Sequence, residues 1–529
     1  MPTDCISFQS SGYFSKLMQD YLDQKPELKS LYNNFPTLEN FEKQITEKAA
    51  NFDSNNRIAL VETLQKQYQK IDISDSTKQN ISLLALQNTF TITTGHQLNL
   101  FSGPLYFLYK IISVINLTKE LKSKYPSYNF VPVYWMATED HDFEEINYFN
   151  FKGKKIRWNA ESNGPVGRLS TTGLEDLFEV YSKELGSSTN AAELKKLFEN
   201  AYLDHENLAD ATRFLANALF ANYGLVILDA DDANLKRAFI PYVKEELENQ
   251  TSFKEVQKSI EALADYSVQV NPREINLFYI EDQLRERIIF EDDKYWVNNT
   301  KISFSKEEIF KVLESNPEKF SPNVIMRPLY QEIILPNLCY IGGGGEIAYW
   351  LELKAFFDAV NITFPILLVR NSVLLATEKQ AKKADNLNLT WKDLFSKSES
   401  LMSHITHKLS PFPIDLTPQR EALERQFEYL FELAEKTDKS FSGAVKAQEV
   451  KQKKGLENLE KRLLKAQKRK LQDQLQRVAD LQCELFPNYG LQERQTNFSE
   501  FYLEKGEQLI PILIQKLKPL EHNFDIIII

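Results

Sequence analysis

The feature that most constrains the fold is a stretch of the chain with the pattern strand, helix, strand. Residues 88–94, NTFTITT, are rich in β-branched side chains and are typical of a buried strand. A long helical pattern follows over residues 105–124, and residues 130–136, FVPVYWM, form a second apolar run. Two strands joined through a helix run parallel, and ligands of such sheets bind at the carboxyl ends of the strands. The sequence therefore predicts an α/β fold with a site after these two strands.

The same alternation of predicted strands and helices returns later in the chain. Strands are predicted at residues 224–230 and 365–370, and a strand at 338–341 leads into a helix at 346–360. Between them, residues 269–300 have the pattern of antiparallel strands and turns, which indicates an insertion. The terminal isoleucines are expected to form a short strand within a sheet. We therefore predict a Rossmann-like parallel-sheet core with insertions and a C-terminal α-helical coiled coil.

The coiled coil is predicted from the segment between residues 418 and 485, which is rich in Gln, Glu, Lys, Arg and Leu. Leu464, Leu471, Val478 and Leu485 lie seven residues apart, which is the spacing of a heptad repeat. Leu456 and Leu463 are one residue out of that register, which indicates a stutter or a helical hairpin. The predicted domains are a helical segment at 1–88, the core at 89–416 with insertions at about 150–222 and 250–320, the coiled coil at 417–486, and a segment at 487–529 that returns to the core.

Charge and composition exclude several classes of protein. The net charge is −11, which argues against a dedicated nucleic-acid coat. Between residues 446 and 477, however, there are eleven Lys or Arg residues and four Asp or Glu residues. A solvated helix face is the favoured interpretation of this basic stretch, and a phosphate-rich partner is the alternative. With three Cys far apart, six His and no CxxC, a zinc ribbon or a disulfide scaffold is not expected. No signal peptide or membrane span is predicted, so the cytoplasm is the expected compartment.

The first candidate cluster follows the first predicted strand. Gly95, His96, Gln97 and Asn99 lead into Ser102-Gly103-Pro104-Leu105-Tyr106 at a helix opening. Free backbone N–H groups at a helix N-terminus suit an anion such as phosphate, and a histidine could add a donor. A tight turn with a hydrogen-bonded histidine is an equally good interpretation.

The second cluster follows the second predicted strand, in the run Glu139-Asp140-His141-Asp142-Phe143-Glu144-Glu145. Five carboxylates around one histidine could serve as a general base, bind an ammonium group or hold a divalent cation such as Mg²⁺. We expect at least two of Asp140, His141 and Asp142 to line a site, while other carboxylates cap the next helix. A structural zinc is not expected, since no thiol is near.

Two further clusters lie towards the C-terminus. Arg327 precedes the run Gly342-Gly343-Gly344-Gly345-Glu346, whose glycines allow close backbone approach to a ligand. A flexible connector, with Glu346 as a helix cap, is the alternative. Residues 486–494 contain a turn signal followed by polar residues, which would also serve as a plain helix stop. Cys339 is expected to be a buried apolar residue rather than a nucleophile.

Taken together, these segments resemble one family. The order TTGHQLNLFSGPLYFLYKI, VPVYWMATEDHDFEEIN, SPNVIMRPLYQEIILPNLCYIGGGGEIAYW and LFPNYGLQERQTNF is similar to the bacillithiol biosynthesis cysteine-adding enzymes, the BshC family. The resemblance runs from about residue 88 to the C-terminus. It implies a Rossmann-like core related to class I synthetases and nucleotidylyltransferases, and a homodimer formed through the coiled coil. It implies a ligase that joins cysteine to the amino group of glucosaminyl malate.

The sequence departs from the family pattern at two places. Members of the family often have Gly-Gln-Gln where this chain has Gly95-His96-Gln97. They also often have Gly-Gly-Pro-Gly-Glu at residues 342–346, where this chain has a fourth glycine. The first difference puts a family-wide catalytic role of His96 in doubt. The second keeps the backbone loop and loses only rigidity.

The chemistry of such a reaction suggests a nucleotide, because a carboxylate needs activation before it can form an amide and ATP is the usual activator. ATP or ADP is expected as a substrate or ligand, with no tightly bound cofactor. We expect its phosphates near the helix opening at residues 102–106, and a second, nucleotide-sized pocket where the coiled coil meets the core. The residues expected around the nucleotide are Gly95, Gly103, Tyr106, Asn371, Ser372, Asn488, Gly490, Gln492 and Arg494.

For the other substrates, Asp140 and Asp142 are expected to hold the ammonium of cysteine, and His141 to accept the proton of the attacking amine. Arg327 and Arg370 are expected to bind the malyl carboxylates by bidentate hydrogen bonds. The remaining candidate contacts are His96, Gln97, Asn99, Gly344, Gly345 and Glu346. Two alternatives stay open: a nucleotidylyltransferase-like enzyme acting on another amine, and a non-enzymatic coiled-coil scaffold that binds nucleic acid.

Overall fold

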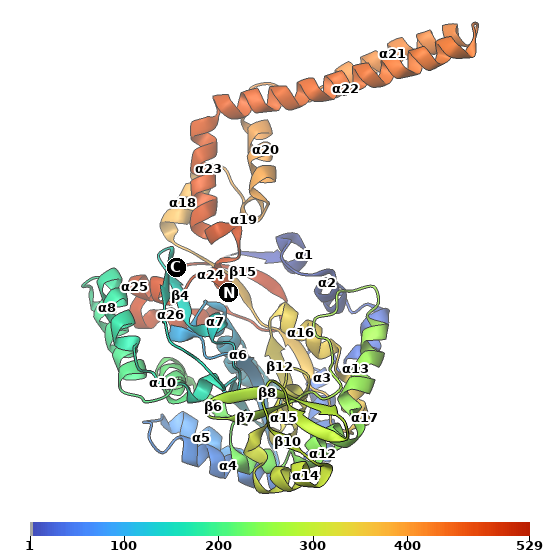
Figure 1. Ribbon diagram of the computed structural model, residues 1–529. Coiled ribbons are helices and arrows are strands. Elements are labelled where there is room, and N and C mark those ends of the chain that lie inside the picture. The colour runs from blue at the N-terminus through green and yellow to red at the C-terminus, as the bar shows by residue number, and fades with distance from the viewer. Residues whose placement is uncertain (1–3) are drawn as a thin grey trace. The chain divides into compact units, whose positions relative to one another are not determined.

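The computed structural model describes residues 4–529 (Figure 1). The chain divides into two compact units, and we describe each by itself. The larger unit comprises the chain up to residue 375 together with residues 491–529, and the smaller unit comprises residues 376–490. Across residues 4–529, no helix has the length and apolar character needed to cross a bilayer.

A five-stranded parallel sheet forms the centre of the larger unit. Its strands are β2 (Thr89–His96), β3 (Asn129–Met136), β6 (Val226–Asp229), β12 (Asn337–Gly342) and β13 (Ile366–Val369). The spatial order is β13-β12-β2-β3-β6, and every neighbouring pair is parallel. Numbered along the chain, this order is 3-2-1-4-5, which matches five of the six strands of the Rossmann order and confirms the expected fold class. The order reverses between β2 and β12, where ligands of such sheets bind.

The predicted strand–helix–strand unit is confirmed. Helix α6 (Tyr106–Lys124) connects β2 to β3 and packs on both strands. Its Val114, Leu117 and Leu121 join Ile92 of β2 in one buried cluster. Burying each of these side chains stabilises the fold by about 1.5–3 kcal/mol, so the helix is held by its apolar face.

Hydroxyl groups on β2 explain how a threonine-rich strand can be fully buried. The Oγ1 atoms of Thr91 and Thr93 donate to Asn337 Oδ1 at 3.3 and 2.9 Å. Thr94 Oγ1 donates to the carbonyl of Ile341 at 2.7 Å. These bonds satisfy polar groups that would otherwise destabilise the interior, and they join β2 to β12.

An antiparallel sheet is inserted between β6 and β12, and it confirms the strands predicted over residues 269–300. Its order is β10-β9-β8-β7-β11. The strands are β7 (Leu277–Glu281), β8 (Leu284–Glu291), β9 (Lys294–Val297), β10 (Ser303–Phe304) and β11 (Phe320–Pro322). A smaller hairpin, β4 (Tyr148–Phe151) with β5 (Lys154–Arg157), follows β3.

The two ends of the chain meet in a third sheet, ordered β1-β15-β14. The terminal strand is confirmed as β15 (Asn523–Ile528), and β14 spans Ser372–Ala376. Strand β1 (Asp4–Ser7) pairs antiparallel with β15, although we expected a helical N-terminus. Its partner lies at the other end of the sequence, so no local pattern indicated this strand.

Helices complete the larger unit. Those before the central sheet are α1 (Phe8–Ser11), α2 (Lys16–Leu22), α3 (Asn40–Asn51), α4 (Asn55–Gln67) and α5 (Asp75–Leu83). Those within or after the sheet are α7 (Phe143–Ile146), α8 (Leu174–Leu185), α9 (Thr189–Phe198), α10 (Leu208–Phe220), α11 (Ala233–Arg237), α12 (Ile240–Asn249), α13 (Thr251–Ala262), α14 (Lys306–Ser315), α15 (Met326–Ile334), α16 (Gly344–Leu351), α17 (Lys354–Ala359), α24 (Gln492–Gln495), α25 (Ser499–Lys505) and α26 (Leu509–Lys516).

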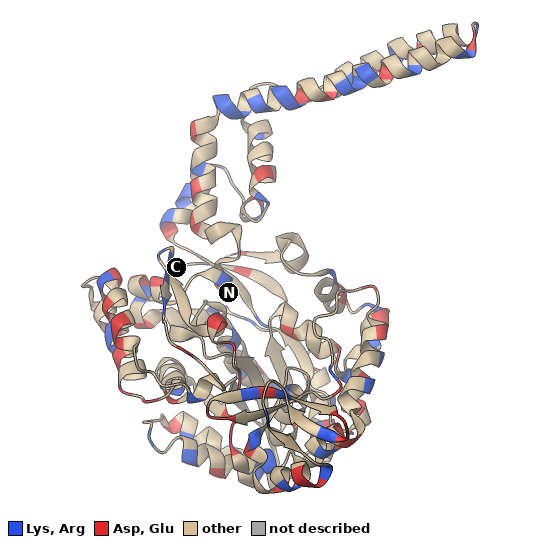
Figure 2. Cartoon of the chain, viewed as in Figure 1, with Lys and Arg blue, Asp and Glu red and all other residues tan. Residues whose placement is uncertain are grey.

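The smaller unit is helical. Its helices are α18 (Glu378–Asn386), α19 (Trp391–Leu394), α20 (Ser398–Leu409), α21 (Thr417–Ala434), α22 (Lys439–Lys470) and α23 (Gln472–Leu485). Helices α21 and α22 form the hairpin that was one of the two alternatives for the broken register, and Phe427, Ala434 and Val445 are buried between them. Figure 2 shows Lys and Arg spaced along α22, with Lys468, Arg469 and Lys470 in its last turn.

The heptad positions do not lie on one continuous helix. Helix α22 ends at Lys470, and Leu471 leaves the helical conformation with φ −98° and ψ 14°. Beyond it, Val478 and Leu485 are buried on α23, which packs against α18 and α20. Part of the leucine repeat is therefore covered within the chain itself.

Candidate active site

A cavity of about 600 Å³ opens at the carboxyl ends of β2, β3 and β12, where the strand order reverses. Five cationic side chains and three carboxylates line it, so positive charge is in excess. The cations are Lys110, Arg273, Arg285, Arg287 and Arg327, and the carboxylates are Glu139, Asp140 and Glu346. A low-dielectric cavity with this balance favours anionic ligands.

The end of β2 presents Gly95 and His96 to this cavity. A Cβ at Gly95 would lie 3.1 Å from Tyr340 Oη, so the glycine allows close packing of the strand end. The His96 ring is 6% exposed and meets the Tyr106 ring edge-on at 5.3 Å. Burial lowers the pKa of His96 well below its ordinary value, and the charges of Lys110 and Arg370 lower it further. The ring is therefore neutral at pH 7, and the imidazolium donor expected from the sequence is disfavoured.

The loop after His96 has a strained backbone. Ser102 adopts a positive φ of 66°, and Gly103 follows with φ 61°. A Cβ at Gly103 would lie 2.6 Å from Asn99 Cβ, so only glycine fits there. The Asn99 amide donates to the carbonyl of Glu145 at 3.1 Å, which ties the loop to the acidic segment after β3.

Lys110 is a site residue that the sequence reasoning missed. Its Nζ donates to the carbonyl of Gly95 at 2.6 Å and pairs with Glu346 Oε1 at 2.5 Å. Tyr340 Oη donates to the other Glu346 oxygen at 2.8 Å. Burial lowers the pKa of Lys110, and Glu346 opposes that shift without cancelling it. The signal available in the sequence was a single lysine within the apolar run YFLYKIISVI.

Arg327, which the sequence predicted to be a substrate contact, lies on the cavity wall. Its guanidinium sits 5.8 Å from the Trp135 ring and 5.6 Å from the Tyr340 ring. It donates to Gln331 Oε1 at 3.1 Å and to Tyr349 Oη at 3.3 Å. These contacts fix its plane, so a bound anion would meet an already oriented group.

The acidic segment after β3 places Asp140 in the cavity wall. Gln97 Nε2 donates to Asp140 Oδ2 at 2.9 Å and to Glu145 Oε2 at 2.8 Å. Burial by itself would raise the pKa of Asp140, but hydrogen bonds from the His141 backbone N–H and from Gln97, together with the charge of Arg285, outweigh it and lower the pKa. Asp140 is therefore ionised at pH 7, while the neighbouring Asp142 is exposed at the start of α7.

His141 is half exposed, and its ring faces Arg285 of the inserted sheet. Arg285 NH1 lies 2.7 Å from His141 Nδ1. A guanidinium can only donate, so Nδ1 accepts and the neutral ring carries its proton on Nε2. In this arrangement His141 has no free acceptor nitrogen, which disfavours it as the base.

Two more arginines of this region were also missed. Arg273 precedes β7, and Arg287 lies two residues after Arg285 on β8, so Arg285 and Arg287 share one face of the strand. Arg285 stacks on Phe278 at 3.9 Å and donates to the carbonyl of Pro322. The guanidinium groups of Arg273 and Arg287 have no ion pair or hydrogen bond within residues 4–529. No local signal marked them, because their role depends on where the inserted sheet lies.

Arg370 lies elsewhere, in a buried ion pair. Its NH2 pairs with Glu493 Oε1 at 2.7 Å, and the two side chains are 3% and 1% exposed. Gly344, Gly345 and Arg494 line a smaller cavity of about 160 Å³ beside it. Glu493 thus already neutralises the Arg370 guanidinium. Arg273 and Arg287, which are unpaired in the cavity of about 600 Å³, are better placed to bind an anionic ligand.

Three other expected nucleotide contacts make structural hydrogen bonds. Asn371 accepts from Ser113 Oγ at 2.8 Å, and Gln492 bonds both the N–H and the carbonyl of Leu375 at 2.9 Å. Ser372 Oγ lies 3.4 Å from Arg370 NH1. Asn488 and Gly490 belong to the smaller unit.

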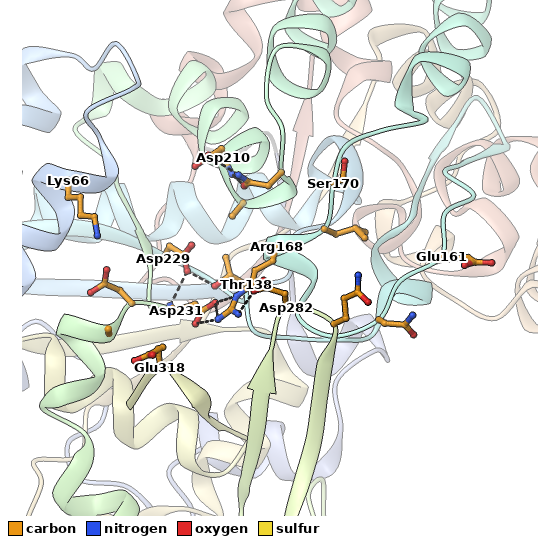
Figure 3. Close-up of a pocket in the computed structure, with 18 residues that line it drawn as sticks. Lys66, Thr138, Glu161, Arg168, Ser170, Asp210, Asp229, Asp231, Asp282 and Glu318 are labelled. Atoms are coloured by element: carbon orange, nitrogen blue, oxygen red, sulfur yellow. Dashed lines mark hydrogen bonds and ion pairs between the residues drawn. The ribbon is translucent and has the colours of Figure 1, made fainter. Parts of the chain in front are cut away.

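A third cavity, of about 1000 Å³, lies beyond β6 and shares Thr138 with the cationic cavity of about 600 Å³ (Figure 3). Arg168 stands inside it and binds Asp231 at 2.8 Å and Asp282 at 3.0 Å. Asp229 accepts hydrogen bonds from Thr138 and from the backbone of Asp231. Seven carboxylates and two cations line this cavity, namely Glu161, Asp210, Asp229, Asp231, Asp232, Asp282 and Glu318 with Lys66 and Arg168. This excess of negative charge disfavours the binding of phosphates and carboxylates in this cavity.

Across residues 4–529, no group of three or more His, Cys, Asp or Glu side chains is arranged to hold a metal ion. Cys339 is fully buried, and burial raises the pKa of its thiol well above the ordinary value. The expectation that it is a packed apolar residue is consistent with this burial.

Comparison with known proteins identifies the family. A family model described as "Bacillithiol biosynthesis BshC, N-terminal Rossmann-like domain" matches residues 1–371, and one described as "Bacillithiol biosynthesis BshC, C-terminal coiled-coil domain" matches residues 373–529. The chain belongs to the BshC family. This confirms the resemblance and the ligase class expected from it, since the curated BshC relatives below are named as ligases.

Three of the curated relatives are similar to this BshC chain over nearly their whole lengths. A protein of Flavobacterium johnsoniae named "Putative cysteine ligase BshC" is 83% identical over 529 residues, covering 100% of both chains. One of Flavobacterium psychrophilum with the same name is 64% identical, covering 100% of this chain and 99% of its own. A third, from Cytophaga hutchinsonii, is 39% identical and covers 98% and 97%.

Proposed function

We propose that this protein joins cysteine to the amino group of glucosaminyl malate and so forms the thiol bacillithiol, through an ATP-activated cysteine carboxylate. The observation that carries the proposal is the cationic cavity at the reversal of strand order. Arg273 and Arg287 offer guanidinium groups without protein partners there. The cavity is lined by five cations and three carboxylates, so a substrate with two carboxylates would balance its charge.

The malyl carboxylates would bind against Arg287 and Arg273, in the cavity that Arg327 also lines. Guanidinium–carboxylate pairs are strong and directional because two parallel N–H donors meet two oxygens. Arg285 is held by His141 and Phe278 and would position the neighbouring arginine rather than bind substrate itself. This assignment replaces Arg370, whose charge is already paired with Glu493.

The cysteine carboxylate must be activated before an amine can displace an oxygen from it. ATP would supply the activation by forming an acyl phosphate or an acyl adenylate, with Mg²⁺ entering as part of MgATP. The opening of α6 and the Lys110 ammonium lie beside Gly95, and both favour phosphate groups in the same cavity. The ionised Asp140 would hold the ammonium of cysteine.

The test is reconstitution with L-cysteine, glucosaminyl malate and MgATP, followed by mass spectrometry of thiols and nucleotides. We expect bacillithiol together with AMP or ADP, and loss of most turnover in Asp140→Asn. His404→Ala, which changes an exposed side chain of the smaller unit, is the control and should leave turnover unchanged. Absence of bacillithiol from the active wild-type protein would refute the proposal, and product without AMP or ADP would remove the ATP step.

A nucleotidylyltransferase-like enzyme acting on another amine is the second candidate, favoured by the Rossmann strand order alone. Screening amines for pyrophosphate release would identify it. The scaffold alternative depends on the basic helix α22, and it requires salt-dependent binding of DNA or RNA that is lost when Lys468, Arg469 and Lys470 are neutralised.

We also propose that the protein is a cytoplasmic homodimer formed through the hairpin of α21 and α22. The hairpin exposes apolar side chains that a second copy could cover, among them Tyr429 at 63%, Val450 at 57% and Leu459 at 55% exposure. Analytical ultracentrifugation of the full chain and of Tyr429→Lys with Val450→Lys tests this. A wild-type monomer at micromolar concentration would contradict it.

A further inference from the structure

A chain of polar side chains connects Arg327, on the wall of the cationic cavity, to Lys48 on α3. Arg327 NH1 donates to Gln331 Oε1 at 3.1 Å, and Gln331 Nε2 donates to Glu332 Oε1 at 3.0 Å. Lys48 Nζ pairs with the other Glu332 oxygen at 2.8 Å. A guanidinium only donates and a carboxylate only accepts, so these two partners fix the orientation of the Gln331 amide.

Arg327 has no counter-ion in this chain of contacts. Among residues 4–529 it makes no ion pair, and its hydrogen bonds go to two uncharged groups, the Gln331 amide and the Tyr349 hydroxyl. The side chain is partly exposed and lines the cavity. A Cβ at Gly95 would lie 3.8 Å from Arg327 NH1, so this end of the guanidinium is beside the carboxyl end of β2.

Two carboxylates of this region are balanced by other cations. Glu332 pairs with Lys48, and Glu346, which lines the same cavity, pairs with Lys110. The Arg327 guanidinium therefore keeps its charge on the cavity wall. An ion held away from water without a partner destabilises the fold, and an anionic ligand would offset that cost.

The residue type at position 331 decides whether this charge stays open. Arg327 and Gln331 are four residues apart on α15, so their side chains lie on one face of the helix. A carboxylate in place of the Gln331 amide would pair with Arg327 directly, whereas the neutral amide orients the guanidinium and leaves its charge available.

We propose that Gln331 is a positioning residue that holds Arg327 as an uncompensated cation for an oxyanion of the substrate, either a carboxylate or a phosphate. The assignment of that oxyanion to glucosaminyl malate or to ATP rests on the proposed function. The open charge of Arg327 does not rest on it, because it follows from the contacts of Gln331 and Glu332.

Two substitutions separate this role from plain packing. Gln331→Glu keeps the shape and adds a carboxylate, whereas Gln331→Met keeps the length and removes the hydrogen bonds without adding charge. Isothermal titration calorimetry of the full chain with L-malate and with inorganic pyrophosphate measures the affinity for a carboxylate and for a phosphate separately. The compound whose affinity falls identifies the class of oxyanion at Arg327.

We expect Gln331→Glu to weaken binding of that anion about 10- to 150-fold, the range for losing a hydrogen bond to a charged group. Gln331→Met should weaken it about 2- to 10-fold, because the charge of Arg327 stays open. A purely structural role predicts the reverse order, since glutamate is closer to glutamine in shape.

Gln44→Glu is the matched control. Gln44 is also fully buried in the larger unit, but it hydrogen-bonds Asn34 and the carbonyl of Phe364 instead of Arg327. It should leave both anion affinities unchanged. Near-UV circular dichroism checks the folding of each variant.

A double-mutant cycle covers the case in which Gln331→Glu does not fold. The affinity lost in Gln331→Met is measured with and without Arg327→Met. The loss should vanish in the Arg327→Met background, because Gln331 acts through that guanidinium. An equal loss in both backgrounds overturns the proposal.

Wild-type affinity for both anions in folded Gln331→Glu, or an equal or larger loss in Gln331→Met, also overturns it. So does failure of the wild-type protein to bind either anion. None of these outcomes depends on the ligase reaction. Weakened anion binding in Gln331→Glu supports the proposal even if no bacillithiol forms, and unchanged binding refutes it even if bacillithiol does form.

Discussion

Asp525 offers the sharpest test of the electrostatics, because its carboxyl lies inside the third sheet. It sits on β15 opposite Cys5 of β1, is 3% exposed, and lies 3.5 Å from Asn371 Nδ2. Burial raises the pKa of Asp525 to about 7, and the charge of Glu521 adds to the shift. The folded state therefore binds a proton that the unfolded chain has released.

The sign and size of the effect follow from linkage. Between the unfolded pKa of about 3.9 and the folded value near 7, the free energy of unfolding falls by about 1.4 kcal/mol per pH unit. The total loss is about 4 kcal/mol, present above pH 7 and absent below pH 4. Asp525→Asn keeps the shape and cannot ionise, so it should be more stable than wild type by up to that amount at pH 8 and no more stable at pH 4.

The assay is urea unfolding at several pH values, followed by tryptophan fluorescence. Four of the five tryptophans lie in the larger unit, and Trp391→Phe removes the signal of the smaller unit. The difference in unfolding free energy between Asp525→Asn and wild type should rise with pH and level off above 7. A difference that stays constant from pH 4 to pH 8 would refute the reasoning.

Three further predictions concern the site and its support. Arg287→Gln should raise KM for the dicarboxylate substrate about tenfold or more with kcat nearly unchanged, because a charge-assisted hydrogen bond contributes about 1.5–3 kcal/mol. Steady-state assays measure both constants. An equal KM for variant and wild type would exclude Arg287 from the substrate site. Glu493→Gln should destabilise the larger unit by about 3–5 kcal/mol in urea, because the buried Arg370 loses its partner, and a change below 1 kcal/mol would contradict this. Gly103→Ala should lower the melting temperature clearly, because its φ is 61° and a Cβ would meet Asn99, whereas Gly345→Ala, with open space around it, should not.

The strands and the long helix of the core could be predicted because their signals are local. The β-branched run before Gly95 and the apolar run before Ala137 each form a buried strand, and the helix between them is fixed by its own apolar periodicity. The positions of Gly95, His96, Asp140 and Glu346 at strand ends followed directly from these elements, because parallel strands end at one edge of the sheet.

The rest of the site could not be predicted, because it depends on contacts between distant parts of the chain. Arg285 and Arg287 face the cavity only because the inserted sheet lies over the strand ends. Arg370 was expected to bind substrate, and its partner Glu493 is 123 residues away in sequence. In the sequence, Lys110 is one residue of an apolar helix. Only the tertiary structure brings Glu346 beside it.

The sequence by itself determined the main strands and the long helix of the core, the parallel sheet and the edge at which its strands end, because side-chain periodicity and backbone preferences act over a few residues. Only the tertiary structure decided which charges remain free. An ionic group in a low-dielectric interior is governed by its nearest partner, and that partner is chosen by packing rather than by proximity in sequence. For this reason Arg370 is neutralised, whereas the guanidinium of Arg287 has no partner among the described residues.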